Sequence, residues 1–151
     1  MGAIMEFATE KQIASFLSTC RIEGQKNFLM AFKKKTWLKS FIDFFIIGGS
    51  YYVQSSVKPK LLAFTPKGIY LMDISDVTEN RSNQVVEIPW NDVKDFTYQT
   101  VLNTVRLNWH YQNEDYIFSV DVGQISQHVG QYQFNKEHYD YLAQHDFFQK
   151  E

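Results

Sequence analysis

The feature that most constrains this fold is a strict alternation of apolar and polar residues between residues 104 and 122. The apolar members of the first run are Val105, Leu107, Trp109 and Tyr111, and those of the second run are Tyr116, Phe118, Val120 and Val122. Successive side chains of a strand point to opposite faces, so each run predicts a strand with one buried face. The polar sequence QNED between the runs predicts a turn, and hence an antiparallel hairpin.

Several segments further upstream have the same β character. The sequences KLLAF and IYLMDI flank TPKG, where Pro66 and Gly68 suit the second and fourth positions of a type I turn. VVEIPW and VKDFTYQ predict two short strands, and NFLMAFKK (residues 27–34) predicts the first strand. Residues 76–84 are polar and predict a loop. The chain is therefore expected to form roughly seven strands in antiparallel hairpins.

A helix is predicted near each end of the chain. The N-terminal helix has one apolar face with the spacing of buried helical residues, formed by Ile13, Phe16, Leu17 and Cys20. Thr9 and Gln12 have the form of a capping box at its start. For the C-terminal helix, Asn135 is the predicted N-cap and Phe134 with Tyr139 a hydrophobic staple; its buried face is Tyr139, Leu142, Ala143 and Phe147. The predicted fold class is mainly β (α+β).

Length and composition indicate a single domain covering residues 1–151. The chain has 151 residues, of which 44% are hydrophobic, enough to bury a core. We expect an N-terminal helical segment within residues 1–26 and an insertion at residues 36–54 between the first strands. Cys20 is the one cysteine, so an internal disulfide framework is excluded, and a reducing compartment is indicated. Neither a signal peptide nor an apolar run long enough to span a bilayer is recognisable, which predicts a cytoplasmic protein.

The net charge of −2 hides an uneven distribution along the chain. Residues 1–67 carry ten Lys and Arg against four Asp and Glu, whereas residues 68–151 carry five against thirteen. Such a split can polarise the surface and steer a charged partner. Alternatively, strands from the two halves lie next to each other and the charges mix. The sequence leaves these two outcomes open.

The order of these phrases resembles the bacterial pleckstrin-homology-like (PH-like) domains. The resemblance rests on KLLAFTPKGIYLMDI, on VVEIPWNDVKDFTYQ, on the VRLNWHY and YIFSV hairpin and on the closing helix, which span about residues 60–148. It implies a partly open antiparallel barrel of about seven strands, capped by the last helix. It also implies a platform that binds lipids or proteins and is rarely an enzyme. Members often carry a basic residue where Gly68 stands here, and Lys67 is the candidate to replace it.

The chemistry of a catalytic, metal or cofactor site is not recognisable. The histidines, His110, His128, His138 and His145, lack metal-ligand spacing and are predicted to be solvated. Cys20 lies on the apolar helix face and is predicted to be a buried, inert thiol. Lys33–Lys35 is the one dense basic run in an otherwise acidic chain, which disfavours nucleic acid. The sequence therefore predicts a protein that is not an enzyme and needs neither metal nor cofactor.

The stretch KKKTWLKSFIDFFIIGG (residues 33–49) bears most directly on function. It falls where a simple barrel needs a short loop, and it predicts a helix over residues 36–46, a turn at Gly48 and Gly49, and a strand at residues 51–54. Its aromatic face has three possible partners: the chain's own barrel, another protein chain or a membrane. The candidate contact residues are Lys33, Lys34, Lys35, Trp37, Phe41, Phe44, Phe45 and Lys67.

Two functions follow from this stretch. The first is a non-catalytic binding module that acts through protein–protein contacts, including self-association. The alternative is a peripheral membrane module at the inner face of the membrane. It would bind anionic lipid through Lys33–Lys35 and the aromatic helix that follows, because lysines near an anionic surface each add about 1 kcal/mol.

Overall fold

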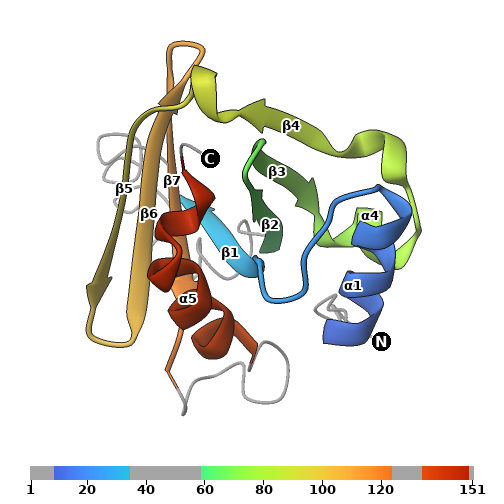
Figure 1. Cartoon of the computed structure of the whole chain (residues 1–151). Coiled ribbons are helices and arrows are strands. Elements are labelled where there is room, and N and C mark those ends of the chain that lie inside the picture. The colour runs from blue at the N-terminus through green and yellow to red at the C-terminus, as the bar shows by residue number, and fades with distance from the viewer. Residues whose placement is uncertain (1–8, 35–58, 124–133, 150–151) are drawn as a thin grey trace, which may run out of the picture.

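A computed structural model describes residues 9–34, 59–123 and 134–149 of the chain, which form a curved antiparallel sheet with helices beside it (Figure 1). The strands are β1 (Phe28–Lys34), β2 (Pro59–Thr65), β3 (Gly68–Asp73), β4 (Val86–Pro89), β5 (Lys94–Val101), β6 (Thr104–Tyr111) and β7 (Glu114–Asp121). The helices are α1 (Glu10–Thr19), α4 (Ile74–Thr78) and α5 (Phe134–Gln144), with short 3-10 turns η2 (Ser82–Gln84), η3 (Trp90–Asp92) and η4 (Asp146–Phe148).

The seven strands form one sheet in the order β4-β3-β2-β1-β7-β6-β5. β4 and β5 are therefore consecutive in the chain but form the two opposite edges of the sheet. In Figure 1, β5–β7 form one layer, β1–β4 turn away from it, and α1 with α4 lies beside the second layer. The predicted fold class is confirmed: a mainly β, partly open antiparallel barrel with a helix near each end.

The β2–β3 hairpin turns at Pro66 and Lys67, as the sequence predicts. The Thr65 hydroxyl oxygen accepts hydrogen bonds from the main-chain N–H groups of Lys67 (3.1 Å) and Gly68 (3.3 Å). A Cβ atom at Gly68 would lie 2.2 Å from the carbonyl oxygen of Ile88 on the neighbouring strand. This close approach explains why glycine stands at this position, because any side chain there would push β4 away from β3.

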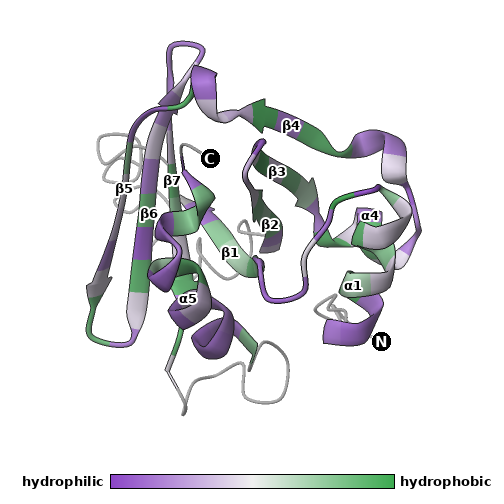
Figure 2. Ribbon diagram, in the orientation of Figure 1, coloured by the Kyte–Doolittle hydropathy of each residue, from purple (hydrophilic) through white to green (hydrophobic). Residues whose placement is uncertain are grey.

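One part of the core lies between α1, α4 and the outer face of the first three strands. Ile13, Phe16 and Leu17 of α1 are buried against it, as the helical spacing predicts. The capping box is also confirmed, because Thr9 and Gln12 exchange main-chain to side-chain hydrogen bonds. Figure 2 shows the hydrophobic residues of α1 and the strands in green. Burial of this apolar face, more than helix propensity, stabilises a helix of ten residues.

The second part of the core fills the inside of the barrel. The alternation in β6 and β7 is confirmed: Leu107, Trp109 and Phe118 are at most 2% exposed. From the C-terminus, Leu142 and Phe147 enter the same cluster, and the Phe147 ring lies 4.9 Å from that of Phe64. The last helix and η4 therefore close this side of the barrel, as predicted.

The predicted loop at residues 76–84 is partly wrong, because the chain forms α4 and then η2 in this region. Ile74 and Val77 are buried in the first part of the core. Asp73 and Asp76 cap the helix reciprocally, and the Asp73 N–H donates to Asp76 Oδ2 at 3.1 Å. The apolar pair three residues apart was the signal for this short helix, but it is too short for a periodicity argument.

Asn135 was predicted to be the N-cap of α5, and this prediction is wrong. It lies within the helix, and its side-chain amide accepts from the Met30 N–H and donates to the Met30 carbonyl oxygen, both at 3.0 Å. It also donates to the carbonyl oxygen of Asp121 at 3.1 Å. β1 pairs with β7 only over Phe32–Lys34. Where the two strands diverge, the amide supplies the donor and acceptor that a neighbouring strand would otherwise supply.

His138 was predicted to be solvated, and this prediction is wrong: its side chain is fully buried. The Nδ1 atom lies 2.8 Å from the Phe28 carbonyl oxygen, which can only accept, so Nδ1 carries a proton. The Nε2 atom lies 3.1 Å from Glu10 Oε2 and connects α5 to α1. The sequence does contain a signal for burial, because Phe134, His138 and Leu142 follow each other at intervals of four residues.

Candidate functional site

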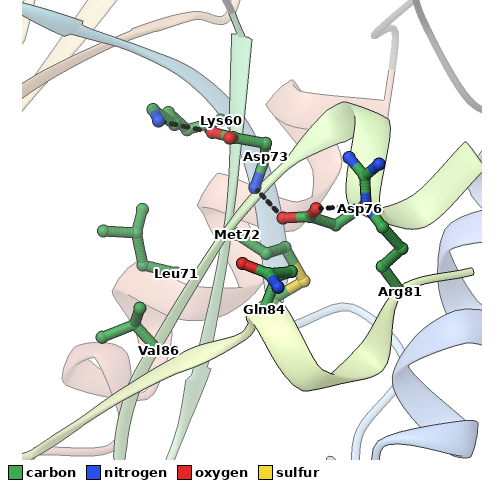
Figure 3. Close-up of a pocket in the computed structure, with 8 residues that line it drawn as sticks. All are labelled: Lys60, Leu71, Met72, Asp73, Asp76, Arg81, Gln84 and Val86. Carbon is green, nitrogen blue, oxygen red and sulfur yellow. Dashed lines mark hydrogen bonds and ion pairs between the residues drawn. The ribbon is translucent and has the colours of Figure 1, made fainter. Parts of the chain in front are cut away.

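A hollow of about 460 Å³ lies where β4 stops pairing with β3 (Figure 3). Pairing of β3 with β4 ends at Leu71 and Val86. β3 then continues to Asp73 paired with β2 alone, while α4 and η2 carry the chain outward. Its lining residues are Lys60, Leu71, Met72, Asp73, Asp76, Arg81, Gln84 and Val86. Val86 is 47% exposed, so the hollow combines an apolar side with a charged rim.

The charges around this hollow neutralise one another. Lys60 forms an ion pair with Asp73, and Arg81 Nε lies 3.2 Å from Asp76 Oδ1. Asp76 is only 4% exposed, and its carboxylate also accepts from the Asp73 N–H. The Arg81 N–H donates to the Asp76 carbonyl oxygen at 2.7 Å, which closes the turn after α4. These groups hold the α4–η2 connection together, and none of them is a free cation ready for an anionic ligand.

Most of the contact residues predicted from the sequence lie outside the described residues. These are Lys35, Trp37, Phe41, Phe44 and Phe45, together with the predicted helix over 36–46 and the strand over 51–54. Lys33 and Lys34 are the last residues of β1, and Lys67 is exposed on the β2–β3 turn. Phe32 pairs with Pro59 at the start of β2, whereas Lys67 follows the end of β2, so the structure does not bring Lys33 and Lys67 together.

Lys33 is already engaged with groups on β7. Its Nζ atom lies 3.3 Å from Glu114 Oε2 and 4.7 Å from the centre of the Tyr116 ring. Burial, and then the nearby Glu114 carboxylate, raise the pKa of Tyr116, so its phenol stays neutral. Asp115 is exposed beside Glu114. The end of β1 therefore presents a lysine that is paired with a carboxylate and contacts a tyrosine ring, not an isolated basic patch.

The uneven charge of the sequence is partly cancelled in space. β1 and β2 come from the basic part of the chain, and β3 and β7, from the acidic part, flank them. Lys33 pairs with Glu114, Lys60 with Asp73, and Lys26 with Glu137 at 2.8 Å. Each pair joins a lysine of the first part to a carboxylate of the second. The sequence left polarised and mixed charges open, and at these three positions the charges mix.

The sequence interpretation did not single out the edge strand β5. Among the described residues, β5 pairs with β6 alone. Val101 is 52% exposed and Leu102 is 91% exposed at its end, and Leu102 has a φ of 57°. A left-handed conformation is unfavourable for leucine, and an exposed apolar residue at such a position is uncommon. The signal in the sequence was the absence of charge between residues 96 and 103.

Two further observations concern chemistry and membranes. Within residues 9–34, 59–123 and 134–149, no three His, Cys, Asp or Glu side chains are grouped so that they would hold a metal ion. Partial burial raises the pKa of the Cys20 thiol, which keeps it protonated and unreactive. No helix in the same ranges has both the length and the apolar character needed to cross a bilayer.

Comparison with known proteins adds no relative: no protein-family model, curated protein or solved structure matches this chain. Membership of the PH-like family therefore stays a prediction from the sequence. The fold and the contacts described above are the basis for a functional proposal.

Proposed function

We propose that this chain is a non-catalytic, PH-like binding module that acts through protein–protein contacts, including contacts between its own copies. The environment of Lys33 carries the proposal. The predicted contact segment begins directly after β1, and at that point the structure places a lysine between Glu114 and the Tyr116 ring.

This environment favours a protein surface over an anionic membrane. A lysine near anionic lipid adds about 1 kcal/mol, but that gain requires a charge that is not already neutralised. The carboxylate of Glu114 would in addition be repelled by the anionic lipid headgroups. An apolar and aromatic core with a polar rim is, by contrast, the usual composition of a protein interface.

Sedimentation velocity and vesicle sedimentation together test this proposal. We expect the mass of the protein to rise with concentration between about 1 µM and about 1 mM, the range of weak specific association. We expect no binding to anionic vesicles at low or physiological salt. A protein that stays monomeric throughout this range would contradict the self-association.

A triple variant separates the membrane alternative from the proposal. The substitutions Lys33→Ala, Lys34→Ala and Lys35→Ala would remove about 3 kcal/mol of lipid attraction if the alternative held. Lys11→Ala is the control, because it also removes an exposed lysine but lies on α1, outside the candidate contact residues. Salt-sensitive binding to anionic vesicles that the triple variant loses and the control keeps would overturn the proposal in favour of the lipid.

A further inference from the structure

Among the described residues, the longest part of the sheet without a strand neighbour is the outer edge of β5. β5 has eight residues and pairs only with β6 within the described parts of the chain. The first half of this edge is irregular, since the register shifts between Lys94 and Thr97, and Asp95 has a φ of 58°. Such a bulge, with Lys94 before it and Asp95 within it, discourages pairing. Thr97–Val101 has neither protection.

The hydrogen-bonding direction of each residue in this half follows from the hairpin. Val101 pairs with Thr104 across the two-residue turn of Leu102 and Asn103, so this pair exchanges main-chain hydrogen bonds. Alternation then places Gln99 with Arg106, and Thr97 with Asn108, in the same kind of pair. The main-chain N–H and C=O groups of Tyr98 and Thr100 therefore point away from β6, toward the outside of the sheet.

The side chains along this edge suit a second copy of the same strand. Residues 96–103 contain no charged residue, so two copies would not set like charges opposite each other at the new seam. The closest charge on the outer face is Arg106, which lies one strand further in and thus well away from its counterpart in the second copy. Val101 is 52% exposed and would gain an apolar contact.

From this edge we infer that two copies of the chain pair through β5, antiparallel and around a twofold axis at Gln99. This inference rests on the self-association proposed above and places it at β5, which β7 and β6 separate from the surface around Lys33. In this register Tyr98 of one copy lies opposite Thr100 of the other, so their outward N–H and C=O groups bond. Gln99 lies opposite Gln99, and Val101 opposite Thr97. The two sheets become one continuous sheet across the dimer.

Variants of Thr100 can distinguish pairing through the edge of β5 from a structural role of this residue, because the two roles use different groups: the main-chain N–H and the hydroxyl. Thr100 is exposed, and its hydroxyl forms a 3.2 Å hydrogen bond with that of Tyr139 on α5. Thr100→Pro removes the hydroxyl and the outward N–H but no hydrogen bond to β6, so an edge strand tolerates it. Thr100→Val removes the hydroxyl alone and is the matched control.

Sedimentation equilibrium of the full chain and its variants tests the inference. We expect Thr100→Pro to raise the dimer dissociation constant at least about tenfold, since the dimer loses two hydrogen bonds by symmetry, and Thr100→Val to leave it nearly unchanged. Gln99→Lys changes an exposed side chain and is expected to keep the fold, so it tests the inference even if Thr100→Pro does not fold. It is expected to weaken the dimer similarly by placing like charges at the axis.

Each outcome decides between the two proposals. If the wild-type chain dimerises and both Thr100→Pro and Gln99→Lys dimerise equally well, the β5 edge is excluded, while self-association through another face stands. If the wild-type chain is monomeric at every concentration, the edge pairing fails and the self-association in the proposed function fails with it. Loss of the dimer in Thr100→Val as well would assign the effect to the hydroxyl and contradict the edge pairing.

Discussion

β4 and β5 are the two edges of one sheet, yet their exposed sides differ. The pair of Lys67 and Trp90 is hydrogen-bonded at 3.2 Å, so alternation leaves Glu87 and Pro89 as the residues of β4 that face outward. Proline has no N–H, and β4 is only four residues long. β5 is twice as long and directs the main-chain groups of Tyr98 and Thr100 outward.

Under the proposed pairing through β5, this difference limits the assembly to two copies. A sheet with donors and acceptors free at both of its edges would add copies without limit. A sheet with one protected edge and one open edge forms a closed pair instead. The protection of β4 depends on contacts that the sequence specifies closely, namely Pro89, Gly68 and the η3 connection. The following changes test these contacts, the junction of β1 and β7 where Asn135 lies, and the exposed surface near that junction.

The largest effect is expected at the junction of β1 and β7. Asn135→Ala removes the amide that bonds both main-chain groups of Met30. Two buried polar groups then lose their partners, and we expect the free energy of unfolding to fall by about 4 kcal/mol. Asn135→Asp keeps the acceptor for the Met30 N–H, so urea unfolding should place it between alanine and the wild type. If Asn135→Ala and the wild type are equally stable, the Asn135 amide does not stabilise the junction of β1 and β7.

The next largest effect breaks the protected edge itself. Gly68→Ala puts a Cβ atom where the Ile88 carbonyl oxygen lies 2.2 Å away. β4 must shift, and we expect a loss of about 3 kcal/mol in the free energy of unfolding. Lys67→Ala on the same turn changes an exposed side chain and is expected to stay within about 0.5 kcal/mol of the wild type. Similar urea midpoints for the two variants would contradict the close approach.

A smaller effect concerns the connection between the two edges. The Trp90 indole N–H donates to the Thr65 carbonyl oxygen at 2.7 Å, and its ring contacts Phe96 at 5.3 Å between centres. Trp90→Phe keeps an aromatic ring but loses the donor, which should cost about 1 kcal/mol in thermal or urea unfolding. Trp90→Ala also loses the ring contact, so it should cost clearly more. If the two variants unfold alike, the ring contact contributes nothing.

The smallest effect is a pH dependence of the stability, at the exposed surface near the junction of β1 and β7. A hydrogen bond from Lys26, and then its charge, lower the pKa of Glu137 below the usual value. A carboxyl group with a lowered pKa stabilises the fold above its unfolded pKa of about 4.3 and loses this as the pH falls through the folded value. Glu137→Gln should therefore be slightly less stable than the wild type at neutral pH and equal to it in acid. A difference that persists in acid would contradict the ion pair.

Local patterns in the sequence predicted much of the fold. Alternation fixed the faces of β6 and β7, because one side of that hairpin meets the core and the other meets solvent. Gly68 and Pro66 marked the β2–β3 turn through backbone geometry. In both cases the determining interaction lies within a few residues of the chain or repeats at a regular interval.

Long-range contacts were beyond the sequence. His138 and Asn135 are polar, and composition alone suggests exposure; their burial depends on main-chain groups of β1 that lie more than a hundred residues earlier. The pairing of Lys33 with Glu114 likewise required the β1–β7 register. The candidate β5 edge was missed because an edge is defined by which strands pair, and no local pattern in Thr97–Val101 reports that.

Hydrogen exchange of single main-chain amides, at a low and a high concentration of the wild-type protein, tests whether two copies pair through β5. Gln99 should be protected at both, because its N–H bonds to β6. The outward amides of Tyr98 and Thr100 should exchange quickly in dilute solution and slowly in concentrated solution, while that of Glu87 on β4 stays fast. Tyr98 and Thr100 amides that exchange equally fast at both concentrations would contradict pairing through β5.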